Sequence, residues 1–127
     1  MGYTTEFSGE FALDKPLTIA QKQELEAFAE ERHGGNTEAF AGYPGFWCQW
    51  VPNDDGTAIK WDGGEKFYSY VQWLQYIIDH FIKPWGLTLN GEVAWFGEED
   101  DDLGKILVRE NIITTLQGTV VYRTESN

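Results

Sequence analysis

The sequence contains one cysteine and two histidines, and this scarcity excludes several kinds of site. Cys48 has no second thiol with which to form an internal disulfide, a pattern that fits a reducing cytoplasm better than secretion. Together with His33 and His80, it cannot supply the closely spaced ligand pairs of a structural zinc site. The sequence therefore implies no zinc site and no cofactor.

Long apolar runs are also missing. No run approaches the roughly 18 residues that a membrane-spanning helix needs. Residues 1–6 lack the basic and then apolar pattern of a signal peptide. We therefore expect a cytoplasmic protein that is not bound to a membrane.

Basic residues are few, with 9 Lys and Arg against 21 Asp and Glu, which gives a formal charge of −12. A surface with this field repels a phosphate backbone, so direct binding of DNA or RNA is not expected. The same field speeds encounter with a partner of opposite charge. The composition therefore favours a protein partner with a basic surface, and it leaves the oligomeric state open.

Aromatic residues are abundant, with six Trp, six Tyr and eight Phe among 127 residues. A chain of this length and composition predicts a single domain with a ring-rich core that needs no metal or disulfide to fold.

Hydrophobic periodicity predicts a strand and a helix in the first third of the chain. Alternation over residues 3–13 is typical of a half-buried strand, in which Gly9 indicates a bulge or bend. Thr18 and Gln21 have the spacing of a capping box, which predicts the start of a helix. The glycine pair that opens residues 34–45 should stop this helix, and a loop should follow.

The middle of the chain predicts a hairpin and a second helix. Residues 46–51 and 58–61 alternate around a polar turn, with these residues in candidate core positions and Trp47 on the other face: Cys48, Trp50, Ile59 and Trp61. Asp62 and Glu65 have capping-box spacing, which predicts a helix that begins there and runs to about Phe81.

The last third predicts strands. Residues 87–96 alternate, although Asn90 and Gly91 could instead form a tight turn. A hairpin is expected over residues 105–117 with its turn near Glu110 and Asn111, and residues 119–122 could add an edge strand. The whole order is strand, helix, strand, strand, helix, strand and hairpin. It predicts a single α+β domain over residues 1–127, with two helices on one face of a mostly antiparallel sheet in split βαβ (ferredoxin-like) order plus a C-terminal hairpin.

No catalytic constellation is recognisable. Cys48 lies in a strand pattern, where a buried thiol is ordinary packing, and His80 lies near a helix C-terminus, where an imidazolium suits the helix dipole. Residues 63–66 lack the spacing of a phosphate-binding loop. With 21 acids, a carboxylate pair is always available somewhere, so its presence argues nothing. We predict a protein that is not an enzyme.

Two acidic segments are candidate contact sites. Asp54 and Asp55 lie in the first hairpin turn, and a second run lies between two strands: Glu98, Glu99, Asp100, Asp101 and Asp102. Hard cations accept such carboxylates, but neither segment has the spacing of a calcium loop, and a solvated loop is the simpler interpretation.

Several rings fall outside the main apolar stripes, namely Trp47, Tyr68, Trp73 and Tyr76. Exposed rings of this kind mark a protein-binding patch or a platform for sugar stacking. The alternative is that a loop or the other sheet face covers them.

The chain also resembles a family of small acidic proteins of bacteria and bacteriophages, a domain of unknown function. The likeness rests on residues 1–5, 15–18, 47–52, 61–68, 83–86, 89–93 and 104–106, which read MGYTT, KPLT, WCQWVP, WDGGEKFY, KPWG, LNGEV and GKI. The family commonly has a longer, Arg-rich segment after its first helix, which residues 30–34 do not match. The resemblance implies a phage or prophage setting, where small acidic proteins often block host proteins, and it implies no catalytic residue.

These observations favour a non-enzymatic acidic protein-binding module, such as a phage-encoded inhibitor that docks on the nucleic-acid-binding surface of a host protein. The predicted contacts are Asp54, Asp55, Glu98, Glu99, Asp100, Asp101 and Asp102, with Trp47 or Trp73 as anchors if their rings are exposed. Two alternatives stay open: a small-ligand or carbohydrate binder that uses exposed Trp and Tyr, and an enzyme that depends on carboxylates or a cation.

Overall fold

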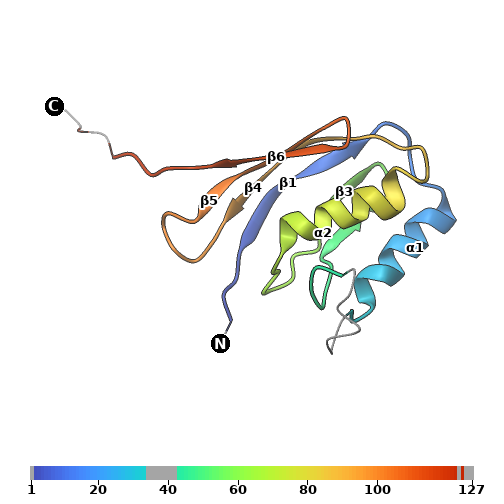
Figure 1. Ribbon diagram of the computed structural model, residues 1–127, viewed down its shortest axis with the longest axis horizontal. Helices are drawn as coiled ribbons and strands as arrows, with labels where there is room; N and C mark the ends of the chain where they lie inside the picture. Colours follow the sequence, from blue (N-terminus) through green and yellow to red (C-terminus); the bar gives the residue numbers. More distant parts are fainter. Residues whose placement is uncertain (1, 34–42, 123, 125–127) are drawn as a thin grey trace.

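The computed structural model describes residues 2–33, 43–122 and 124, which form a six-stranded antiparallel sheet and two helices. Figure 1 shows both helices on the same side of the sheet. The strands are β1 (Glu6–Leu13), β2 (Trp50–Pro52), β3 (Ala58–Trp61), β4 (Leu89–Phe96), β5 (Leu103–Arg109) and β6 (Ile112–Gln117). The helices are α1 (Ile19–Glu30) and α2 (Tyr70–Ile77), and a π-helical turn, η1 (Ile78–Ile82), extends α2. The predicted α+β class is confirmed, as is the order of the elements along the chain.

The first strand lies in the middle of the sheet, whose order is β2-β3-β1-β4-β5-β6. β1 pairs with β4 over its whole length, from Glu6 opposite Phe96 to Leu13 opposite Leu89. A bulge or bend was predicted at Gly9, and the unbroken register shows that Gly9 forms no bulge against β4. Gly9 instead has a φ of +109°, and a Cβ there would lie 2.8 Å from the Glu92 carbonyl oxygen. Glycine is therefore required because the two backbones approach closely.

The hydrophobic core fills the space between the helices and the sheet. It contains fully buried rings from several segments, including Phe11 of β1, Trp50 of β2 and Phe67 before α2. The predicted hairpin faces are confirmed: Cys48, Trp50 and Ile59 are buried and Trp61 is half-buried, whereas Trp47 is exposed. Strand β2 begins at Trp50, later than predicted.

The predicted capping box of α1 is present in full. The Gln21 N–H donates to the Thr18 hydroxyl at 3.1 Å, and the Thr18 N–H donates to the Gln21 side chain at 3.0 Å. The helix ends at Glu30, because Glu31 adopts an extended conformation. The glycine pair predicted to stop the helix lies outside the described residues, as does most of the predicted loop.

The capping box predicted at Asp62 and Glu65 is wrong. The Asp62 carboxylate accepts a hydrogen bond from the Gly64 N–H at 2.8 Å, an Asx turn that competes with helix formation. Residues 62–69 are irregular, with left-handed backbone at Lys66 and Ser69, and α2 begins only at Tyr70.

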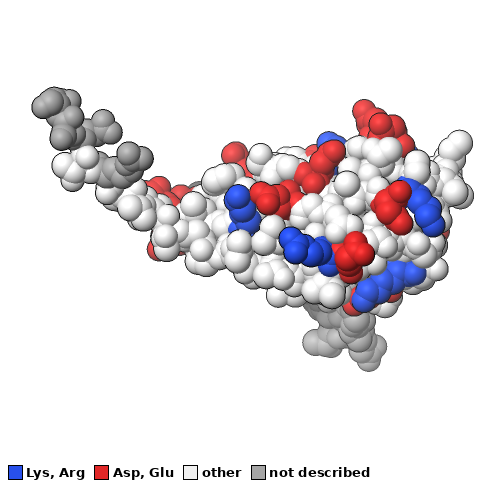
Figure 2. Space-filling view, turned by 90° about the horizontal axis from the view of Figure 1, so that it is seen from above, with Lys and Arg blue, Asp and Glu red and all other residues white. Residues whose placement is uncertain are grey.

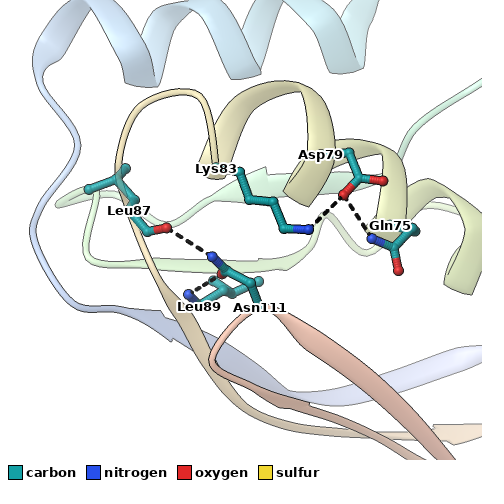
Figure 3. Close-up of polar contacts among 6 residues, drawn as sticks. All are labelled: Gln75, Asp79, Lys83, Leu87, Leu89 and Asn111. Atoms are coloured by element: carbon teal, nitrogen blue, oxygen red, sulfur yellow. Dashed lines mark hydrogen bonds and ion pairs between the residues drawn. The ribbon is translucent and has the colours of Figure 1, made fainter.

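The helix changes its winding at η1, where the Lys83 N–H donates to the Ile78 carbonyl, a spacing of five residues instead of four. Asp79 lies on the exposed side of this segment, where it accepts from Gln75 at 3.0 Å and pairs with Lys83 at 3.3 Å (Figure 3).

Figure 3 also shows that Asn111 of the β5–β6 turn is hydrogen-bonded to the backbone at the start of β4 and just before it. The Asn111 side chain accepts from the Leu89 N–H at 2.6 Å and donates to the Leu87 carbonyl at 3.0 Å.

The β5–β6 hairpin turns at Glu110 and Asn111, as predicted, and both residues have positive φ, as a tight two-residue turn requires. Asn90 and Gly91 do not form a turn, since both pair with β1 inside β4. Residues 119–122 form no strand, so the edge strand predicted there is wrong.

Candidate functional site

Residues 97–102, which we call the acidic loop, join β4 to β5 at the end of the sheet where β1 begins. Two backbone hydrogen bonds close the loop: the Gly97 N–H donates to the Asp102 carbonyl at 2.7 Å, and the Asp102 N–H donates to the Glu99 carbonyl at 3.0 Å. The loop therefore has a defined backbone conformation.

The Asp102 carboxylate fixes the loop to its surroundings. One of its oxygens accepts from the Tyr3 hydroxyl at 2.8 Å, and the other accepts from the Trp95 indole N–H at 3.0 Å. The same Tyr3 hydroxyl accepts from the Glu99 N–H at 3.0 Å. Tyr3 thus connects the two ends of the acidic run through one hydroxyl group.

The segment before β1 is also hydrogen-bonded at this end of the sheet. The Thr4 N–H donates to the Glu98 carboxylate, and the Tyr3 N–H donates to the Tyr68 hydroxyl at 3.2 Å. From the other side, the Gln117 amide donates to the Asp101 carbonyl at 3.0 Å. Glu98 and Asp102 therefore use their carboxylates to hold the fold together.

The remaining carboxylates of the loop, those of Glu99, Asp100 and Asp101, are exposed. Among the residues that the structure describes, no Lys or Arg forms an ion pair with them. On the outer face of the sheet, by contrast, acidic and basic side chains intermingle (Figure 2), and the pair Lys105–Glu92 is 3.2 Å apart there. The acidic loop thus presents unneutralised charge in one fixed place.

The other acidic segment, Asp54 and Asp55, lies far from the acidic loop. Its turn is bonded to the opposite end of β1, where the Leu13 N–H donates to the Thr57 carbonyl at 2.9 Å. The eight residues of β1 separate the two acidic segments by roughly 25 Å at about 3.3 Å per residue. A hydrogen bond from the Thr57 hydroxyl lowers the pKa of the Asp55 carboxyl. The structure therefore does not bring the two predicted segments together.

The prediction that Trp73 serves as an anchor is wrong, because this side chain is fully buried. Its ring packs against Phe28, His33 and Tyr76 between α1 and α2, and its indole nitrogen has no hydrogen-bond partner among the described residues. The buried side of α2 is wider than the apolar stripe of the sequence, since Trp73 points into the core beside Leu74 and Ile77. Trp47 is 47% exposed and Tyr68 is 54% exposed, so both are available to a partner.

Neither candidate nucleophile nor candidate base is placed for chemistry. Cys48 is completely buried, and burial raises the pKa of its thiol to about 12. His33 is also buried, where its ring packs against that of Phe28 at an interplanar angle of 37° and its Nε2 lies 3.0 Å from the Phe28 carbonyl. His80 is exposed and stacks on Tyr76 at 4.0 Å. These contacts are those of packed side chains.

In residues 2–33, 43–122 and 124, no three His, Cys, Asp or Glu side chains converge as ligands for a metal ion. A hollow of about 780 Å³ lies on the outer sheet face over β4, β5 and β6, lined by Glu92, Leu107, Arg109 and Ile112 among others. No described helix is long and apolar enough to cross a bilayer.

The chain matches no protein-family model, and neither a curated protein nor a solved structure shows significant similarity to it. The description of the site therefore rests on its own geometry.

Sequence reasoning missed Tyr3 and Trp95, two of the residues that build the site, and identified Tyr68 only as a ring outside the main apolar stripes. Alternation placed Tyr3 at the start of a strand, and no local pattern links it to Asp102, which lies 99 positions away. The only available signal was the proximity of the aromatic residues to strand ends.

Proposed function

We propose that this protein is a non-enzymatic, acidic protein-binding module that docks the acidic loop on a basic surface of another protein. The observation that carries the proposal is the arrangement of Glu99, Asp100 and Asp101, which are exposed and unpaired on a loop that Asp102 and Tyr3 hold in place. A fixed loop loses little conformational entropy on binding, so its charges can contribute to affinity as well as to the encounter rate.

An aromatic ring adjoins this surface. The exposed Tyr68 is hydrogen-bonded to the Tyr3 backbone, which places it next to the acidic loop. Tyrosine is enriched at the centres of protein interfaces, where its ring packs and its hydroxyl bonds. Tyr68 therefore takes the anchor role in place of Trp73, while Trp47 and the pair Asp54 and Asp55 form separate predicted contacts.

The class of partner follows from the charge. A groove lined with Lys and Arg, such as one that binds nucleic acid, complements a molecule with a charge of −12. We place the protein in the cytoplasm of a bacterium that carries a phage or prophage, as the family resemblance implies, where it would inhibit a host protein. We also assign β1 to β4 with α1 and α2 to the split βαβ (ferredoxin-like) pattern, which the neighbour order β2-β3-β1-β4 supports.

The proposal is tested by affinity purification from a bacterial lysate with the tagged full chain. We expect a basic protein to be retained at low salt, released as salt rises, and displaced by added nucleic acid. The triple variant Glu99→Gln/Asp100→Asn/Asp101→Asn should lose that protein.

A matched control removes the same number of charges from α1 and the residue after it, where Glu24, Glu30 and Glu31 are exposed. The variant Glu24→Gln/Glu30→Gln/Glu31→Gln should retain the partner. A second variant, Asp54→Asn/Asp55→Asn, tests the other acidic segment. Equal retention by the loop variant and the control variant would show that the acidic loop is not the docking site, and retention of no basic protein at low salt would contradict the function.

The hollow on the outer sheet face supports a second candidate function, the binding of a small amphipathic anion. Leu107 and Ile112 supply apolar surface there, and Arg109 supplies a guanidinium that has no ion pair among the described residues. Fluorescence titration with anilinonaphthalene sulfonate should give a binding curve that Arg109→Ala weakens and Lys66→Ala, remote from the hollow, does not. Equal binding by both variants would remove this candidate.

A further inference from the structure

The last strand, β6, leaves one edge of the sheet open. Its even-numbered residues bond to β5, as the Gly118 N–H shows by donating to the Leu103 carbonyl at 2.8 Å. The backbone N–H and C=O groups of Ile113, Thr115 and Gln117 therefore point away from β5. Within the described part of the chain, no strand pairs with this edge.

This edge lacks the devices that normally prevent strand pairing. Residues 112–122 contain no charged residue and no proline, although 24% of the whole chain is charged. The opposite edge strand, β2, is only three residues long and ends in Pro52. Short strands and proline protect an edge, whereas a long uncharged edge is a template for another strand.

The chain beyond β6 adds exposed apolar surface. Figure 1 shows this segment continuing away from the sheet, past the loop that joins β4 to β5. Val121 is 76% exposed and Tyr122 is 86% exposed, and Ile112 and Leu116 of β6 are exposed as well. Apolar side chains on a segment that projects from the fold can be buried only against another molecule.

We propose that a second copy of this chain pairs with β6 and residues 118–122, antiparallel and about a twofold axis at Gln117. In this register, Ile112 of one copy lies opposite Tyr122 of the other, and Ile113 lies opposite Val121. The exposed apolar residues thus cover one another, and the two sheets become continuous. A strand that pairs with its own copy in this way gives a closed, isologous dimer.

The net charge favours self-association through this edge and disfavours it through any other part of the surface. Each copy carries −12, so two copies repel except where both surfaces are uncharged, as residues 112–122 are. The register sets each acidic loop near the same axis, because Gln117 bonds to Asp101. The dimer should therefore tighten as salt screens the loops, whereas docking of the acidic loop on a basic partner weakens with salt.

Sedimentation equilibrium of the full chain tests the proposal. We expect a mass that rises with concentration from 14.5 kDa to twice that value, and a dissociation constant that falls as salt is added. Val121→Glu should raise the dissociation constant about tenfold or more, because two symmetry-related valines lose their apolar partners and gain charge. Ile19→Glu is the matched control, since Ile19 is 77% exposed at the start of α1, and it should leave the constant unchanged.

Amide hydrogen exchange separates strand pairing from contact through side chains alone. The amides of Ile113, Thr115 and Gln117 should gain protection as concentration rises, whereas that of Thr114, which faces β5, should be protected throughout. A monomer at every concentration and salt would overturn the proposal. A dimer without this added protection, or one equally sensitive to Val121→Glu and Ile19→Glu, would do the same.

Discussion

The Asp102 carboxylate accepts hydrogen bonds from two side chains that no local sequence pattern connects to it. Its neighbours Glu99, Asp100 and Asp101 face solvent on the same loop. Adjacent acids of one type therefore have different roles: Asp102 builds the loop, and the others are free to meet a partner.

Replacing Asp102 with alanine should destabilise the fold. The Tyr3 hydroxyl and the buried Trp95 indole would lose their acceptor, which we expect to lower the free energy of unfolding by about 1–3 kcal/mol. Urea unfolding of Asp102→Ala and of the control Asp100→Ala measures the difference. The control should stay within about 0.5 kcal/mol of wild type, as exposed positions do. Equal stability of both variants would show that the Asp102 bonds contribute nothing.

Burial of Cys48 has two measurable effects. The folded protein should not react with a thiol reagent at mildly alkaline pH, whereas the unfolded chain should react at once. The thiol pKa of about 12 in the fold exceeds the ordinary cysteine pKa of 9.0, so between these values the folded state keeps a proton that the unfolded state loses. Stability should therefore fall as pH rises from 9 toward 12. Urea unfolding over this range should show a shallower fall in Cys48→Ala, and rapid labelling of the folded protein would contradict the assignment.

The sequence predicted Cys48 as a core residue because strand alternation reports burial one residue at a time. It did not predict the burial of Trp73, because the ring sits beside the expected helical stripe and packs against Phe28 and His33 from other segments. Contacts between distant segments leave no local pattern in the sequence, so only the structure shows which rings are exposed.

The helix α2 begins at a strained position. Ser69 precedes it with a φ of +57° and makes no side-chain capping bond. A left-handed conformation costs a non-glycine residue about 1–2 kcal/mol, and glycine avoids this cost. We expect Ser69→Gly to raise the free energy of unfolding by about 0.5–1 kcal/mol. The control Ser69→Ala keeps the strain and should give no gain, so stabilisation by alanine alone would show that the backbone at this position is not the cause.

The order of the elements was predictable because each helix and strand has its own hydrophobic period. The start of α2 was not, since Asp62 followed three residues later by Glu65 fits a capping box, whereas Asp62 instead forms an Asx turn with the Gly64 N–H. The edge strand expected at residues 119–122 also failed, because its β-branched and aromatic residues favour an extended chain but none of the described strands pairs with them. Both errors arise where one pattern allows two structures and tertiary contacts select between them.

The net charge of −12 acts on the whole molecule. Self-repulsion among carboxylates destabilises the compact state, and salt screens it. We therefore expect the free energy of unfolding, measured by urea denaturation, to rise as sodium chloride is added at neutral pH. The variant Glu24→Gln/Glu30→Gln/Glu31→Gln should show a smaller rise, because less repulsion remains to be screened. A fall in stability with salt would mean that attractive pairs such as Lys105–Glu92 dominate instead.

The central place of β1 governs how the chain can fold during its synthesis. This strand leaves the ribosome before both of its neighbours, since β3 begins at Ala58 and β4 ends at Phe96. The nascent segment must wait, with Phe7 and Phe11 uncovered, until β4 has been translated. Chaperone binding to nascent chains of increasing length should therefore persist until β4 has emerged and then cease.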